Sequence, residues 1–284
     1  MKKILLALLT ATVVMFSGCA SKSATPETKT GLEGTKVNSY LVGEYMDVAT
    51  AKSKLEAAGF EIVADYASVK KGTTIVYTNE ELKAEAAKPG RAFAAVLRLF
   101  IDEKEKMSSF TNPVYFGKAF MQDEYNHAVF NGALEKINVA FPSLKASSDE
   151  LEFDALADYH FMVGMPYYAD LDTLGKPGAN TAELVQKAKN YKKGKGVVFE
   201  LKLSETSTIL GYDLGRRTKK FVKKIGRANA AILPWIVSIE NGKATALNAK
   251  YYIALSYPLL DMGGFMGIAT VPGAITKDLE KPFK

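Results

Sequence analysis

The feature that most constrains the fold of this chain is an eight-residue sequence motif, here called the phrase, that occurs twice. Residues 90–97 read GRAFAAVL and residues 226–233 read GRANAAIL, so six of eight positions are identical at a separation of 136 residues. The correspondence continues without a gap at five further positions: Leu99 with Trp235, Phe100 with Ile236, Asn112 with Asn248, Tyr115 with Tyr251, and Phe116 with Tyr252. Internal similarity at a fixed offset predicts two copies of one structural unit.

Matches upstream of the phrase set the extent of each copy. TIVY at 74–77 is similar to TILGY at 208–212, and YLVGEYM at 40–46 is similar to FMVGMPY at 161–167. The second copy is longer over this stretch, so we expect an insertion within residues 168–196. These matches predict a first domain at residues 38–145 and a second at 155–284, packed about a pseudo-twofold axis.

Local patterns in the first copy predict an α+β fold. The expected elements are a strand at 39–46, a helix from Asp47 to Gly59, strands at 60–66 and 73–78, a helix at 79–90, hairpin strands at 94–102 and 106–112, and a helix at 125–141. In the second copy Asn241 and Gly242 form the dipeptide typical of a hairpin turn. The order βαββαββα, present twice, predicts two similar domains, each a mainly antiparallel sheet packed with helices.

The phrase itself has a structural interpretation. Gly90 and Gly226 are expected in the left-handed conformation that ends a helix, and the small residues after them let the next strand enter a crowded core. Arg91 and Arg227 follow directly, where a cation can meet the free carbonyl groups of a helix end. Binding of a ligand by these two arginines is the alternative.

The first residues resemble the signal peptide of a bacterial lipoprotein. Lys2 and Lys3 precede an apolar run at residues 4–16, which is short for a membrane span, and the run leads into FSGC. This stretch is similar to a lipobox, in which cleavage leaves the cysteine as the first, lipid-modified residue. Cys19 is the sole cysteine of the chain. We therefore expect a signal peptide at 1–18 and lipidation of Cys19; a buried thiol or an ordinary secretory signal is the alternative.

The remaining chain is expected to be a protein of the cell envelope. Residues 20–36, ASKSATPETKTGLEGTK, are small and polar, which is typical of a flexible tether; we place the lipidated tether at 19–37. Ala20 rather than aspartate follows Cys19, and this resembles the pattern of lipoproteins sorted to the outer membrane rather than the inner one. The sequence thus predicts a lipid-anchored protein that faces the periplasm.

The hairpin and its flanks also carry a resemblance to a family. The segments LPWIVSIENGK in the second copy and TNPVYFGKAF in the first are similar to the bacterial family called domain of unknown function 302, over residues 38–284. Each copy keeps half of the pattern. Leu233 and Pro234 match where the first copy has Leu97 and Arg98, whereas Asn112 and Pro113 match where the second has Asn248 and Ala249. The resemblance implies a small α+β domain in each copy and no particular activity.

Residues suited to catalysis are scarce. There are two histidines, no cysteine besides Cys19, and no phosphate-binding loop, nucleophile elbow or HExxH helix. Acidic pairs such as Asp102 with Glu103 are expected on solvated loops. We expect no catalytic residue and no cofactor, and interpret the chain as a non-catalytic module that binds a small ligand or a partner. An envelope enzyme with a dispersed site is an alternative.

One segment has side chains suited to a metal. Residues 158–168 read DYHFMVGMPYY, and on a strand His160 and Met162 would project from one face, with Met165 just beyond. Imidazole and thioether groups together suit Cu(I), so a periplasmic copper-binding protein is a further alternative. In the competing interpretation Met162, which aligns with Leu41, packs in the core and His160 marks the end of a strand.

Positive charge is concentrated in one segment. Between Lys187 and Arg227 there are 13 lysine or arginine residues and three acidic ones. The segment DLGRRTKKFVKKIGR predicts an amphipathic helix with a basic outer face: Arg216, Arg217, Lys219, Lys220, Lys223 and Lys224. This face suits an anionic lipid surface, a polyanionic wall polymer or an acidic protein partner, or is an ordinary solvated surface. Export argues against nucleic acid.

The seam between the two domains is the expected place for a small ligand, because domain interfaces commonly form clefts. Aromatic residues recur there at equivalent positions after a strand. The predicted lining residues are Tyr115, Phe116, Tyr251 and Tyr252, with Arg91 and Arg227. In the competing interpretation half of these aromatic residues belong to the core.

Overall fold

The computed structural model describes residues 30–284, and residues Leu32–Lys284 form one compact unit. The predicted signal peptide, Cys19 and most of the predicted tether lie outside the described residues. The tether was predicted to reach residue 37, but strand β1 (Lys36–Asn38) begins earlier and pairs with β8 (Glu150–Glu152), which lies between the two predicted domains. Within residues 30–284 no helix has both the length and the apolar character needed to cross a bilayer.

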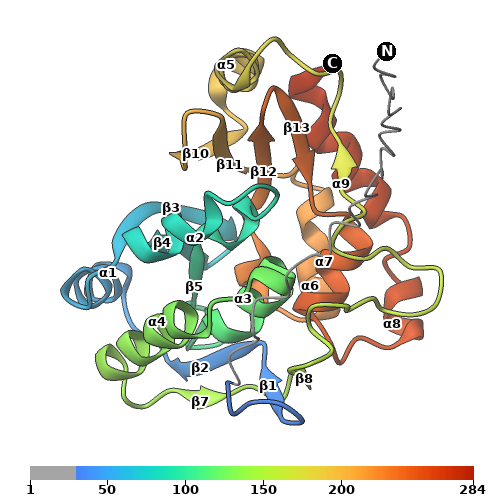
Figure 1. Cartoon of the computed structure of the whole chain (residues 1–284). Helices are drawn as coiled ribbons and strands as arrows, with labels where there is room; N and C mark the ends of the chain where they lie inside the picture. Colours follow the sequence, from blue (N-terminus) through green and yellow to red (C-terminus); the bar gives the residue numbers. More distant parts are fainter. Residues whose placement is uncertain (1–29) are drawn as a thin grey trace, which may run out of the picture. The chain divides into compact units, whose positions relative to one another are not determined.

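The α+β class is confirmed, and the first half of the unit forms a six-stranded antiparallel sheet (Figure 1). Its strands, in the order in which they pair, are β3 (Glu61–Val69), β4 (Gly72–Thr78), β5 (Leu97–Asp102), β6 (Met107–Thr111), β2 (Tyr40–Glu44) and β7 (Lys145–Ala146). Its helical segments are α1 (Val48–Ala57), α2 (Glu80–Ala86), η1 (Ala92–Ala95), α3 (Pro113–Met121), η2 (Gln122–Glu124) and α4 (His127–Ala140). Helices α1 and α4 pack against each other, and α1 also contacts β3 and β4.

The second half forms a five-stranded antiparallel sheet. Its strands, in pairing order, are β10 (Val197–Lys202), β11 (Ser207–Tyr212), β12 (Trp235–Glu240), β13 (Lys243–Ala246) and β9 (Asp172–Thr173). Its helical segments are α5 (Thr181–Asn190), η3 (Tyr191–Gly194), η4 (Thr218–Lys220), α6 (Phe221–Ile225), η5 (Ala230–Ile232), α7 (Ala249–Ser256), α8 (Met262–Met266), α9 (Val271–Glu280) and η6 (Lys281–Phe283).

Apart from β7 at the edge of the first sheet, the two sheets have the same strand order and equivalent connections. In the first sheet β2 lies beside β6, which is followed by β5, β4 and β3. In the second sheet β9 lies beside β13, which is followed by β12, β11 and β10. A helix lies between the first and second strands, and a helix with a 3-10 turn lies between the third and fourth. Because residues 32–284 form one unit, the division into two domains about a pseudo-twofold axis stays a prediction. Each half also has a helix, α3 or α7, directly after the hairpin, an element that the βαββαββα order omitted.

Local sequence signals formed the elements that they predicted. Asp47 accepts a hydrogen bond from the Thr50 amide at the start of α1, as an N-cap residue does. Asn112 and Asn248 occupy equivalent N-cap positions of α3 and α7, and each accepts from the amide two residues on. Asn241 and Gly242 both have positive φ in the turn between β12 and β13, as their dipeptide predicted.

Two predicted elements were wrong. Residues 161–167, aligned with the strand of the first copy, form turns instead of a strand, and the first strand of the second sheet is the two-residue β9 within the predicted insertion. Gly164 has a φ of +81° and Pro166 has no amide hydrogen, so this stretch cannot form a regular ladder. The predicted basic helix is also short, because α6 covers only Phe221–Ile225 after the 3-10 turn η4.

The repeated phrase lies where the two halves meet. The turn η1, which belongs to the first phrase, contacts β11 and β12 of the second sheet, whereas η5 of the second phrase contacts β5 and β6 of the first sheet. Both turns are buried within one continuous hydrophobic core. Gly90 and Gly226 have positive φ, as predicted, but only Gly226 ends a helix, because α2 ends at Ala86 and is capped by Ala87. Small residues follow them because each turn packs closely on the opposite sheet, where larger side chains would not fit.

Candidate functional site

Arg227 of the second phrase forms the most buried ion pair of the described residues. Its Nε and Nη2 atoms donate to the two carboxylate oxygens of Asp102 at 2.6 and 2.8 Å, and Asp102 lies at the end of β5 with a fully buried side chain. Nη2 also donates to the carbonyl oxygens of Lys70 and Lys71 in the turn between β3 and β4. The predicted capping of a helix end is therefore wrong for Arg227, since the opposite half supplies all of these acceptors.

Arg91 of the first phrase is also engaged within the chain. Its Nη2 lies 2.9 Å from the Asp123 carboxylate, and its guanidinium lies over the Tyr168 ring at 5.8 Å from the centroid. The neighbouring Gly90 amide donates to Glu240, at the end of β12, in the opposite half. The two arginines thus hold structural positions, and the assignment of ligand binding to Arg91 and Arg227 is replaced by ion pairing within the unit.

The predicted aromatic lining of the seam is packed core. Tyr115, Phe116, Tyr251 and Tyr252 are all buried. The hydroxyl of Tyr115 on α3 donates to the carbonyl of Leu255 on α7 at 2.8 Å, and Tyr251 on α7 reaches the carbonyl of Ala119 on α3 at 3.4 Å. Each hydroxyl meets the last turn of the other helix, and the two contacts join positions that correspond in the aligned sequence segments. These side chains join α3 to α7 and leave no open ligand pocket at the positions predicted for one.

Replacing the Tyr115 hydroxyl is expected to destabilise the fold. Tyr115→Phe leaves the buried carbonyl of Leu255 without this donor, which costs about 1–3 kcal/mol of unfolding free energy. Tyr251→Phe is the matched control with a smaller expected loss, because the Ala119 carbonyl keeps a hydrogen bond from the Gln122 side chain. Urea unfolding of both variants measures the difference. Equal losses, or none at Tyr115, would contradict the reciprocal arrangement.

The predicted metal ligands do not share a strand face. His160 packs its ring against Tyr167 at 4.4 Å between centroids, and its Nδ1 lies 3.4 Å from the carbonyl of Asp158. Met162 is exposed rather than in the core, and its carbonyl accepts from the Met165 amide within a turn. The inferences that Met162 packs in the core and that His160 ends a strand are both wrong. Within residues 30–284 no three His, Cys, Asp or Glu side chains lie together as a metal site.

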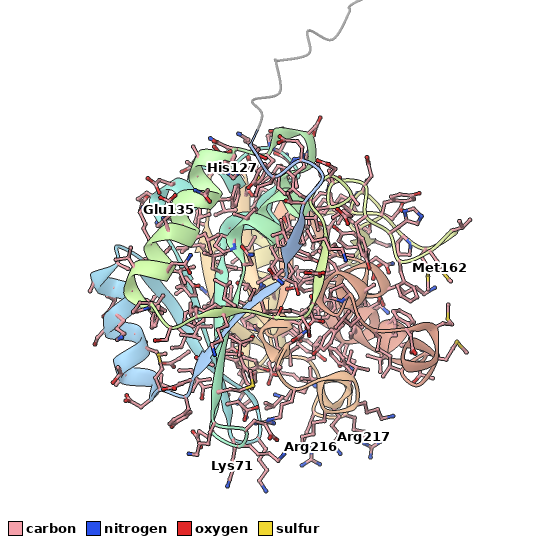
Figure 2. All side chains as sticks on the ribbon, turned by 90° about the horizontal axis from the view of Figure 1, so that it is seen from below. Lys71, His127, Glu135, Met162, Arg216 and Arg217 are labelled. Carbon is pink, nitrogen blue, oxygen red and sulfur yellow. The ribbon has the colours of Figure 1, made fainter. Side chains whose placement is uncertain are left out.

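A cluster of cations on one side of the unit, here called the basic face, has the properties of a binding surface (Figure 2). It comprises exposed side chains from two segments: Lys70, Lys71, Arg216, Arg217, Lys220, Lys223 and Lys224. None of them has an ion-pair partner among residues 30–284. Phe221 and Val222 are buried and fix the segment that carries the last five. The turn of Lys70 and Lys71 is held beside that segment by Arg227.

Lys219 was predicted on the outer face but connects the two sheets instead. Its Nζ lies 2.8 Å from the carboxylate of Asp213 and 3.1 Å from the hydroxyl of Tyr66 on β3, and that hydroxyl donates to Asp213. Burial raises the pKa of Tyr66, and the Asp213 carboxylate raises it further, so the phenol stays protonated beside the ion pair.

Asp278 on α9 holds the turn that presents Arg216 and Arg217. Its carboxylate accepts hydrogen bonds from the Gly215 amide at 2.9 Å and from the Thr218 hydroxyl at 2.6 Å. Partial burial acts to raise the pKa of Asp278, but hydrogen bonds from Lys281, Thr218 and Gly215 outweigh this and hold the pKa below its usual value. The orientation of the basic face therefore depends on an ionised carboxylate beneath it.

A set of exposed apolar side chains, here called the apolar rim, lies on two segments of the second half, one at residues 161–165 and one around α8. It comprises five side chains with between 39% and 95% of their surface exposed: Met162, Val163, Leu259, Met262 and Met266. The rings of Phe161 and Phe265 stack at 5.2 Å and join the two segments that carry it. The Tyr257 hydroxyl donates to the Gly226 carbonyl at 2.9 Å, so the end of α6 touches the chain that leads to α8. Of these five residues the sequence analysis named only Met162. The segment DMGGFM at 261–266, with two methionines around a glycine pair, was the sequence feature that could have indicated the others.

A groove between α1 and α4 is an open hollow of about 520 Å³. Small and apolar residues line it, with charged side chains at its edges: Lys54, Ala57, Ala58, Gly132, Glu135, Lys136, Val139 and Ala140. Figure 2 shows Glu135 on a different side of the unit from Arg216 and Arg217. A flat surface in contact with the basic face therefore leaves this groove free.

Comparisons with known proteins return no match: no family model, no curated protein and no solved structure is significantly similar to this chain. The resemblance to domain of unknown function 302 stays a prediction, as does the lipoprotein signal.

Proposed function

We propose that this chain is a lipid-anchored, non-catalytic protein of the cell envelope whose folded unit lays its basic face on the anionic phospholipids of the membrane that holds its anchor. The observation that carries the proposal is the basic face itself. Seven exposed cations lie together without carboxylate partners among the described residues, although the unit elsewhere pairs many of its lysines with acids. Such an excess of one sign favours an external anionic surface.

Magnitudes support a membrane as the partner. Each cation near an anionic bilayer contributes about 1 kcal/mol, so the basic face supplies several kcal/mol at low salt. The apolar rim adds to this if its methionines and leucine enter the boundary between headgroups and acyl chains. A lipid on Cys19, joined to the unit by a tether that ends before Leu32, would keep the unit close to the bilayer, where even weak surface contacts are populated. The predicted outer membrane is the proposed location.

Vesicle binding by residues 20–284 without acyl groups tests the proposal, since residues 32–284 form a compact unit with their own core. Vesicles containing phosphatidylglycerol are expected to sediment the protein, and vesicles of phosphatidylcholine alone are not. The triple variant Arg216→Gln, Arg217→Gln, Lys220→Gln removes about 3 kcal/mol and weakens binding roughly 100-fold. Added salt is expected to weaken binding of the unaltered protein.

The matched control loses the same net charge elsewhere. Lys36→Gln, Lys52→Gln and Lys136→Gln remove three lysines that are already paired with Glu150, Asp65 and Glu81. This control is expected to bind almost as tightly as the unaltered protein. Equal affinity for both kinds of vesicle, or capture by wall polymer alone, would count against a lipid surface. The mass of the mature chain tests the anchor separately, by the presence of acyl groups on Cys19.

A further inference from the structure

Arg98 on β5 is a buried cation with no carboxylate partner. Only 3% of its surface is exposed, its Nε has no hydrogen-bond partner, and no carboxylate of the described residues lies within ion-pair distance. A guanidinium cannot lose its charge in a protein, so burial cannot be relieved by deprotonation. Four residues along the same strand, Asp102 shows the contrast, because that buried charge has the bidentate Arg227 as its partner.

The surroundings of Arg98 form a narrow crevice between the two halves. It has about 190 Å³ of space outside the atoms but is too narrow to admit a water molecule. Six apolar and aromatic residues line it with Arg98: Phe93, Phe120, Trp235, Ile236, Leu247 and Tyr252. The first two belong to the first half of the unit and the others to the second. Among the described residues no acceptor meets the Nε edge of the guanidinium, and no carboxylate neutralises its charge.

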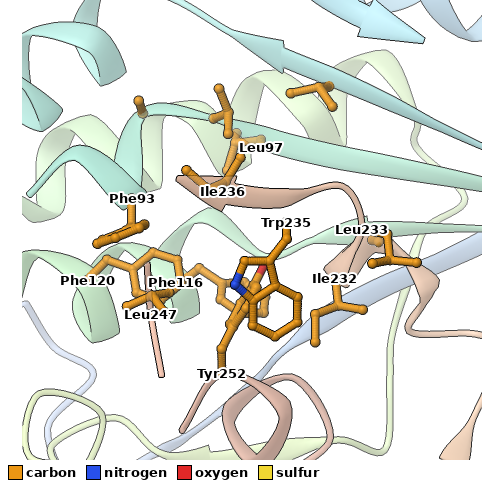
Figure 3. Packing of buried hydrophobic residues seen from close by; sticks show 14 of the residues in the cluster. Phe93, Leu97, Phe116, Phe120, Ile232, Leu233, Trp235, Ile236, Leu247 and Tyr252 are labelled. Atoms are coloured by element: carbon orange, nitrogen blue, oxygen red, sulfur yellow. The ribbon is translucent and has the colours of Figure 1, made fainter. Parts of the chain in front are cut away.

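A second unpaired donor belongs to a residue that lines the same crevice. The Nε1 atom of Trp235 is buried without a hydrogen-bond partner. Figure 3 shows the indole nitrogen on the side of Trp235 that faces Phe120 and Leu247, and the Tyr252 ring packs edge-on against the indole at 5.0 Å. A buried N–H group without an acceptor costs free energy comparable to a lost hydrogen bond. A cation and an N–H donor on one crevice are complementary to a group that is both anionic and an acceptor.

We propose that Arg98 and the Trp235 N–H group bind a small monovalent anion, a halide or the carboxylate group of an organic acid, in the crevice between the two sheets. A single anion would neutralise the charge of the Arg98 guanidinium and accept a hydrogen bond from the Trp235 N–H group. Apolar walls and a single cation disfavour phosphate and sulfate, which carry more charge and hold water strongly. The aromatic and aliphatic side chains that close the crevice must shift to admit the anion.

Trp235 reports on this site directly because it is the only tryptophan of the chain. Iodide, an anionic quencher, is titrated into the full mature protein at constant ionic strength with sulfate as the balancing salt. The expected result is a saturable loss of tryptophan fluorescence that acetate relieves by competition. Neutral acrylamide is expected to quench weakly, because the indole is buried. Anions on the basic face leave this signal unchanged, so the proposed function and this inference are tested separately.

Thermal unfolding supplies a second readout. Acetate at about ten times its dissociation constant is expected to raise the melting temperature by about 2–4 °C relative to sulfate at equal ionic strength. Arg98→Met abolishes both the saturable quenching and the acetate shift, whereas Arg91→Met, outside the crevice, keeps both. The titrations of the unaltered protein decide the question even if Arg98→Met does not fold. Linear iodide quenching no stronger than that by acrylamide, together with equal melting temperatures in acetate and sulfate, overturns the proposal.

Discussion

Above pH 10 the protein is expected to unfold cooperatively, because its interior holds many protonated tyrosines. Burial raises the pKa of eleven tyrosines: Tyr40, Tyr66, Tyr77, Tyr115, Tyr125, Tyr159, Tyr168, Tyr212, Tyr251, Tyr252 and Tyr257. In the unfolded chain these phenols ionise near pH 10. Below pH 10 these phenols are neutral in both the folded and the unfolded chain, so the pH does not oppose their burial. Above pH 10 the free energy of unfolding falls as the pH rises toward the raised pKa values of the folded state.

The expected slope is steep. Each tyrosine that is protonated in the fold and ionised in the unfolded chain lowers the free energy of unfolding by about 1.4 kcal/mol per pH unit. Five such groups remove about 7 kcal/mol per unit, which is comparable to the total stability of a typical domain. Circular dichroism and tyrosinate absorbance, followed together with pH, are expected to change in one step. Tyrosinate formation with retained secondary structure would contradict the buried core.

A single variant tests this slope with little other disturbance. The Tyr77 hydroxyl is buried without a hydrogen-bond partner, so Tyr77→Phe removes one titrating group and breaks no hydrogen bond. The variant is expected to unfold at higher pH than the unaltered protein and with a slope shallower by one proton. At neutral pH its stability is expected to be equal or greater, because an unpaired polar atom is removed from the core.

Arg227→Met is expected to cost about 3–5 kcal/mol of unfolding free energy, since it leaves the buried Asp102 carboxylate without its cation. The same change also releases the turn at Lys70 and Lys71 from the second half of the unit. Urea unfolding at neutral pH measures the loss. The double variant Arg227→Met, Asp102→Asn is expected to recover part of it, because no ionised group then remains buried.

Arg91→Met is the matched control at the equivalent position of the first phrase. Its acidic partners, Asp123 and Glu124, are exposed, with 81% and 40% of their side-chain surface accessible, and exposed pairs contribute about 0–1 kcal/mol. The control is expected to lose much less stability than Arg227→Met. Similar losses for the two variants would show that the repeated arginine acts through packing and that the buried ion pair contributes little.

Much of the fold was predictable from short stretches of sequence. Asp47, the Asn241–Gly242 turn and the hairpin around residues 103–106 formed as predicted, because a capping side chain or a turn dipeptide acts on backbone groups within a few residues. The aligned pair of Asn112 and Asn248 proved to be a pair of helix caps, although the alignment alone did not indicate that role.

The candidate sites were predicted less well, for a related reason. The basic segment was evident from its charge. Lys219 does not belong to the basic face, however, because its ammonium group binds Tyr66 of the first half and Asp213 of the second. The aromatic residues predicted to line a ligand site were placed at the correct seam and in the wrong environment, because α3 and α7 pack directly on each other. In the sequence Arg98 is only a departure from the family pattern. That it is buried without a carboxylate partner follows from the tertiary structure.

The sequence alone determined the hairpins, the helix cap at Asp47 and the segment rich in cations, because each depends on residues close along the chain. Only the tertiary structure decided which charges are paired. Arg227 meets Asp102 across 125 positions, and Tyr115 meets Leu255 across 140. Such partners depend on how the 3-10 turn of one half packs on the sheet of the other. That packing is set by the shape of the whole core, which no short stretch of residues contains.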